Sequence, residues 1–191
     1  AGDPNLLAVL DHFHLQEVRD VLRAVLAGQR EVLLRVAGPV MDRSDEDILA
    51  DLKRLVDEQV LRRLRETVES PEVRKVVSTL RHLGGDAGDK LEVIRVGALE
   101  QVERLRTAHA ADTAFAAAGH IATDINLRGG SKKRWPSEAD LKAAKEALGN
   151  LRDAFKTIVD DLPAFDATIE GEHLSLARAF FRTARAAIDA Y

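Results

Sequence analysis

Residues 89–126 read DKLEVIRVGALEQVERLRTAHAADTAFAAAGHIATDIN, and this stretch decides the fold. It contains no proline and only two glycines. Apolar or small side chains recur in it every three or four residues, at Leu91, Ile94, Ala98, Val102, Leu105, Ala108, Ala111, Phe115, Ala118 and Ile121. This spacing places them on one face of an α-helix. The stretch therefore predicts one long central helix over about 89–126, with the other helices packed against it.

The rest of the chain repeats this spacing in runs that begin with helix-start signals. These signals are Asp3-Pro4, Ser44, Ser70-Pro71 and Ser137. Aspartate and serine cap helix N-termini, and proline suits the first helical turn. The first run continues from Pro4 to Val36 and stops at Gly38-Pro39. We predict an all-α fold, a bundle of five to seven helices in one domain over 1–191, with a possible division into 1–83 and 89–191.

The composition agrees with an all-helical core. Hydrophobic residues make up 46% of the chain but aromatic residues only 4%, so leucine, valine and alanine must form the core. Such a core suits close-packed helices better than a sheet. No apolar run approaches the roughly 20 residues of a membrane-spanning helix, and the N-terminus lacks a secretion-signal pattern. We therefore expect no membrane segment.

Charge and cysteine usage restrict the possible functions. The net charge is -4, from 28 basic and 32 acidic residues, without the basic excess typical of nucleic-acid binders. The chain has no cysteine, which excludes disulfides, thiolate catalysis and cysteine zinc sites and fits a cytoplasmic protein. Alanine and arginine outnumber isoleucine and lysine, which suggests a GC-rich bacterial source. We expect a cytoplasmic bacterial protein.

The first candidate site lies in the predicted central helix, in the segment Arg104-Leu-Arg-Thr-Ala-His109. This spacing of arginine and histidine resembles the short motif of the HEPN superfamily, helical domains found in many prokaryotic ribonucleases and toxin systems. The resemblance covers six residues, and it departs from the family pattern because apolar Leu105, rather than a polar residue, follows the arginine. It implies that Arg104 holds an RNA phosphate and that His109 acts as acid or base, with two copies brought together in a dimer. The alternative is that His109 partly lines the core and that Arg104 solvates the outer face.

The second candidate site is a basic loop. Its members are Arg128, Lys132, Lys133, Arg134 and Trp135. Four cations beside an exposed indole could bind phosphate, nucleic acid or an acidic partner surface. The alternative, which we favour, is a solvated loop whose Trp135 folds back onto the next helix near Leu141.

Three pairs of histidine and carboxylate residues have helical spacing and could bind metal. They are Asp11 with His14, His120 with Asp124, and Glu170 with His173. A di-iron bundle needs carboxylates that project inward from four helices. The apolar stripes of the runs that start at Ser44 and Ser137 carry no such acids. We predict no metal and no other cofactor.

No motif of a common enzyme class stands out. The chain lacks the phosphate-binding G-x-x-x-x-G-K, the strand-borne G-x-G-x-x-G and the G-x-S-x-G nucleophile turn. The final two runs keep strict helical spacing, are interpreted as an antiparallel hairpin, and could serve helix association. We therefore expect a non-enzymatic helical interaction or regulatory module that binds a protein partner or itself, with a homodimer as the form of self-association. The alternative is a HEPN-like RNA-cleaving or RNA-binding protein that uses Arg104 and His109.

Overall fold

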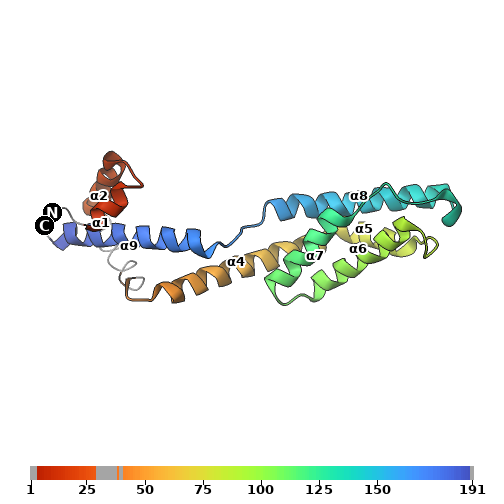
Figure 1. Cartoon of the computed structure of the whole chain (residues 1–191), viewed down its shortest axis with the longest axis horizontal. Coiled ribbons are helices and arrows are strands. Elements are labelled where there is room, and N and C mark those ends of the chain that lie inside the picture. The colour runs from red at the N-terminus through yellow and green to blue at the C-terminus, as the bar shows by residue number, and fades with distance from the viewer. Residues whose placement is uncertain (1–3, 29–37, 39–40, 190–191) are drawn as a thin grey trace. The chain divides into compact units, whose positions relative to one another are not determined.

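The computed structural model describes residues 4–28, 38 and 41–189 (Figure 1). Within these residues it is all-helical, without strands, which confirms the predicted all-α bundle. The helices are α1 (Pro4–Leu10), α2 (Leu15–Gly28), α4 (Asp45–Val68), α5 (Pro71–His82), α6 (Lys90–Thr107), α7 (Ala111–Asp124), the short 3₁₀-helix η1 (Lys132–Arg134), α8 (Glu138–Asp160) and α9 (Ala167–Asp189). The described part has eight α-helices instead of five to seven, because two of the predicted helices are each broken once.

The chain forms two compact units. Unit 1 contains residues 1–54 and 165–191, and therefore both ends of the chain. Unit 2 contains residues 55–164. The boundary between the units falls inside α4, and the connection at 84–88 lies within unit 2. In the described part of the chain, no helix has both the length and the apolar character that a membrane span requires.

The core of unit 2 is made mainly by aliphatic side chains from α4 to α8. α7 packs against α6 and α8, and α5 packs against α8 (Figure 1). The fully buried large side chains of unit 2 are Leu64, Val68, Val77, Leu80, Leu91, Leu105, Ile121, Leu148, Leu151 and Phe155. Most of these positions belong to the predicted apolar stripes. Burial of such side chains is the main stabilising contribution to the unit.

The predicted continuous central helix is wrong. α6 ends at Thr107, and Ala108 and Ala110 adopt extended backbone conformations before α7 begins at Ala111. The break frees the carbonyl oxygen of Ala108, which accepts a hydrogen bond from Arg65 Nη2 at 2.9 Å. It also allows α7 to pack against both α6 and α8, which a straight continuation of α6 would prevent. Phe115, expected in the core, is 45% exposed because smaller side chains of α7 face α8 and α6 instead.

The first predicted helix is broken as well. α1 ends at Leu10 and α2 begins at Leu15. The backbone N–H of His14, just before α2, donates to Glu17 Oε2 at 2.9 Å. The break lets Val9 and Val18, on different helices, share one buried cluster with Ala179 of α9. Val32 and Val36 of the predicted stripe lie outside the described residues.

Unit 1 packs mainly through α1 and α9. Leu6, Leu10, Leu176 and Phe180 surround its small buried cluster. Arg178 of α9 also pairs with Asp45 at 2.9 Å. The apolar stripe of α8 is filled by α5 and α7 in unit 2, and that of α9 is filled by α1 in unit 1. The expected hairpin of these two helices stays a prediction.

Candidate functional site

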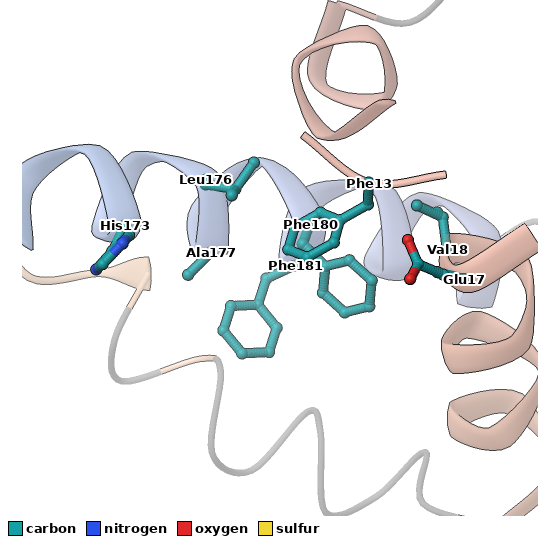
Figure 2. Close-up of a pocket in the computed structure, with 8 residues that line it drawn as sticks. All are labelled: Phe13, Glu17, Val18, His173, Leu176, Ala177, Phe180 and Phe181. Atoms are coloured by element: carbon teal, nitrogen blue, oxygen red, sulfur yellow. The ribbon is translucent and has the colours of Figure 1, made fainter. Parts of the chain in front are cut away.

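The most distinctive cavity in the described part of unit 1 is an open apolar groove of about 410 Å³ (Figure 2). We call it the phenylalanine groove. It is lined by Phe13, Glu17, Val18, His173, Leu176, Ala177, Phe180 and Phe181. Three of the six phenylalanines of the chain lie here, whereas only Phe155 is completely buried in the described core. Aromatic rings held at an accessible surface are typical of binding sites.

The break between α1 and α2 positions one wall of the groove. The backbone N–H of Phe13 still donates to the carbonyl oxygen of Val9 at 3.0 Å, so the ring is held one turn beyond the buried part of α1. Phe13 remains 47% exposed, while nearby Val18 is buried beneath the groove. A continuous helix from Pro4 to Gly28 would have turned these side chains differently. The groove therefore depends on the break.

α9 provides the other wall. His173, Leu176, Ala177 and Phe180 recur every three or four residues and therefore lie along one face of the helix. Phe181 also lines the groove, beside this face. Its ring contacts that of Phe180 edge to face, with the ring centroids 6.1 Å apart. The result is a long apolar strip on α9, open to solvent at Ala177.

The polar residues of the described lining lie at the two ends of the groove. Figure 2 shows Glu17 at one end and His173 at the other, with the phenylalanine rings between them. His173 Nδ1 lies 3.7 Å from Glu170 Oε2 on the preceding turn. Among the described residues, no lysine or arginine lines the groove. In that described lining the one carboxylate is that of Glu17, which also caps α2.

A second groove, between α5 and α8 in unit 2, differs in chemistry. It has a volume of about 540 Å³ and a floor of small or apolar residues that includes Val73 and Ala147. Its rim carries Glu72, Lys75 and Glu146, so charges of both signs surround it. This mixed rim favours no particular ligand, which makes the phenylalanine groove the better candidate.

Arg104 and His109 lie near each other in the chain but not on one helix. Arg104 is in the last turn of α6, and His109 is in the non-helical segment after it. Both side chains are exposed, so His109 does not line the core as the alternative had it. Leu105 between them is fully buried, as expected for an apolar stripe. The neighbouring Arg106 is engaged by Glu69 at 3.1 Å and Glu103 at 2.9 Å.

The basic loop does not present an indole to solvent. Trp135 is only 5% exposed, and its Nε1 donates to Asp89 Oδ1 at 3.2 Å. The indole is therefore buried, as the favoured alternative expected, but its ring lies against Gly85 and Asp89, which precede α6, and the contact near Leu141 stays a prediction. The loop cations Arg128, Lys132, Lys133 and Arg134 are exposed. Two are engaged locally, Lys132 with Glu138 at 2.5 Å and Arg134 with the Gly88 carbonyl at 2.6 Å.

Trp135 belongs to a buried polar cluster that joins two loops of unit 2. The Asp89 carboxylate accepts hydrogen bonds from N–H groups of Leu91, Glu92, Ser131 and Trp135. Burial raises the pKa of Asp89, but these donors together outweigh burial and hold the pKa below its ordinary value. The cluster orders residues 84–89 against 129–135 and is a structural feature of the core.

Glu92 extends this cluster toward α5. Hydrogen bonds from Arg95 lower its pKa most strongly, against the opposing effect of burial, and the Gly85 amide adds to the lowering. The two ion-pair distances to Arg95 are 2.6 and 2.8 Å. Arg95 in turn donates to the Leu80 carbonyl at 2.6 Å, which ties α6 to the end of α5.

The candidate metal pairs remain isolated pairs. His120 Nδ1 lies 2.7 Å from Asp124 Oδ2 on the exposed face of α7. The hydrogen bond from His120 lowers the pKa of Asp124, with help from Thr123. Among the described residues, no group of three or more histidines and carboxylates comes together as metal ligands would.

The predicted helical runs include Phe13, Ala177 and Phe181 among their apolar positions, so sequence reasoning places these side chains in the core and misses the phenylalanine groove. One signal was available. Adjacent residues on a helix are about 100° apart, so Phe180 and Phe181 cannot both face the same neighbour. Comparisons of the chain with protein-family models, with curated proteins and with solved structures gave no match.

Proposed function

We propose that this protein is a non-enzymatic helical interaction module that binds a protein partner through the phenylalanine groove. The observation that supports it is the concentration of phenylalanine at this groove, in a chain with only 4% aromatic residues. Folding alone would favour burial of these rings. Large accessible aromatic side chains are the usual anchors of protein interfaces, where they fill pockets on the partner.

The groove suits a helix better than a small ligand. It is open along α9, with Phe13 half exposed, so a small molecule in it would remain largely in contact with water. Small-molecule sites usually enclose their ligand and aim a few convergent polar groups at it. Here Glu17 and His173 are at opposite ends (Figure 2). An amphipathic helix laid along α9 would cover the strip between them.

Site-specific cross-linking in cells tests this function. A photoreactive amino acid at Ala177, exposed in the groove, is expected to give a covalent adduct with a partner protein. The matched control position is Ala186, also exposed on α9 but nine residues away and therefore on the opposite face. The Ala177 adduct should disappear in Phe13→Ala and persist in Phe115→Ala, a similarly exposed phenylalanine in unit 2. Equal adducts from both positions, or an adduct indifferent to Phe13, would reject the groove as a binding site.

A second candidate function is RNA cleavage or RNA binding in the manner of the HEPN superfamily. What supports it is that Arg104 and His109 are both exposed, and that another cation, Arg65, donates to the carbonyl oxygen of Ala108, the residue before His109. Purified protein would then degrade RNA, and His109→Ala would abolish the activity while His82→Ala would not. Binding of RNA through the loop would be weakened by neutralising Lys132, Lys133 and Arg134. Undiminished RNA degradation by His109→Ala would reject this catalytic role.

A further inference from the structure

The charges of the chain are divided unequally between its units. Unit 1 contains 14 acidic and 10 basic residues, whereas unit 2 contains 18 of each. The whole net charge of -4 therefore belongs to the unit that holds the phenylalanine groove. A partner approaching this unit meets a negative potential, which accelerates association with positive partners and slows that with negative ones.

Two carboxylates lie at the ends of the groove itself. The Glu17 carboxylate lies at one end, and Glu170 lies one turn from His173 at the other. The guanidinium of Arg178, on the same helix, is occupied by Asp45 at 2.9 Å and is only slightly exposed. An occupant with apolar side chains toward the phenylalanines would thus have carboxylates within reach at both of its ends.

From these observations we infer that the occupant of the phenylalanine groove is a basic amphipathic helix, one whose apolar face is flanked by lysine or arginine. The inference rests on the proposed function, because it specifies the partner of the same groove. The apolar face would contact Phe13, Phe180 and Phe181, and the flanking cations would pair with Glu17 and Glu170. A second copy of this chain is disfavoured, because a symmetric dimer through the groove would bring two units of charge -4 together.

Two labelled peptides test the inference with the 191-residue chain. One is an amphipathic helix of leucine and lysine, and the other has glutamate in place of every lysine, so both offer the same apolar face. Fluorescence anisotropy at low salt should show the lysine peptide binding about tenfold or more tightly than the glutamate peptide. Its affinity should fall as salt is added, because exposed charge pairs are screened.

Variants locate the binding. Phe13→Ala should lower the affinity for the lysine peptide about tenfold or more, as expected when an aromatic anchor is lost. Phe115→Ala, which changes a similarly exposed phenylalanine, should leave this affinity unchanged. Glu17→Gln should weaken it about twofold to fivefold, the range for one exposed charge pair. Glutamine can still accept the hydrogen bond from the His14 amide, so α2 keeps its cap. Glu100→Gln, which removes an exposed charge from unit 2, is the control.

The outcomes separate the inference from the proposed function. Equal binding of both peptides, lost in Phe13→Ala, would overturn the basic partner while supporting the groove as a protein-binding site. Binding of the lysine peptide that is unchanged in Phe13→Ala would overturn the inference, because the contact would then be general attraction to an acidic protein. Absence of binding by either peptide would overturn it too, and the cross-linking from Ala177 would then decide the function independently.

Discussion

At the scale of single residues, the contact between Gly85 and Trp135 leaves no room for a larger side chain at position 85. A Cβ atom at position 85 would lie 2.8 Å from Trp135 Cε2, and this ring is buried and cannot move aside freely. We expect Gly85→Ala to lower the free energy of unfolding by about 1–3 kcal/mol, the usual cost of overpacking. Gly84→Ala is the matched control, because a Cβ there meets nothing within 4 Å. Urea denaturation measures both, and equal stability of the two variants would contradict the contact.

Asp89 makes the stability of unit 2 depend on pH. Since the folded pKa values of Asp89 and Glu92 are lowered, their contribution is complete above the ordinary values of about 4 and is lost as the pH falls through the lowered values. Asp89→Asn would place an NH₂ group among N–H donors, and we expect it to cost about 1–3 kcal/mol at neutral pH. Its free energy of unfolding should then fall less steeply than that of the wild type on acidification. If the free energy of unfolding fell equally steeply with pH in the two proteins, this role of Asp89 would be refuted.

At the scale of helices, the N-termini of α8 and α7 differ in whether a side chain caps them. Ser137 Oγ accepts from the Asp140 amide at 3.0 Å at the start of α8, as its role as a helix-start signal predicts, whereas Ala110 at the start of α7 makes no side-chain cap. We expect Ala110→Ser to raise the free energy of unfolding by about 0.5–2 kcal/mol and Ser137→Ala to lower it by a similar amount. Thermal and urea unfolding measure both changes. A destabilising Ala110→Ser would show that the break at 108–110 does not admit a serine cap.

At the scale of the whole molecule, the two units should differ in local stability. Unit 2 has a large continuous core, whereas the described apolar cluster of unit 1 buries mainly Val9, Val18 and Ala179. Hydrogen exchange of the intact chain should therefore protect amides of α5 to α8 far more than those of α1 and α2. Phe155→Ala should lower the free energy of unfolding of unit 2 by about 3–5 kcal/mol and reduce amide protection there. Val9→Ala should reduce amide protection in unit 1. Uniform protection across both units would contradict this division.

The sequence by itself determined the fold class, most helix starts and most of the buried face. Ser70 and Ser137 specify helix starts locally, because their side chains cap the helix N-termini. The apolar spacing specifies the buried face locally, because a period of 3.6 residues places these side chains on one side of the helix. It also indicated that Trp135 would fold back. It did not reveal the partner of that indole, because Asp89 lies 46 residues away in the chain.

Only the tertiary structure decided where helices break and which apolar residues stay exposed. The segments 11–14 and 108–110 carry no proline or glycine, so local propensity allows a continuous helix there. The breaks are favoured because they let two short helices each bury a face that one straight helix could not. The phenylalanine groove follows from the first of these breaks, which places Phe13 beside α9. A side chain's burial depends on what packs over its helix face, and that neighbour is distant in sequence.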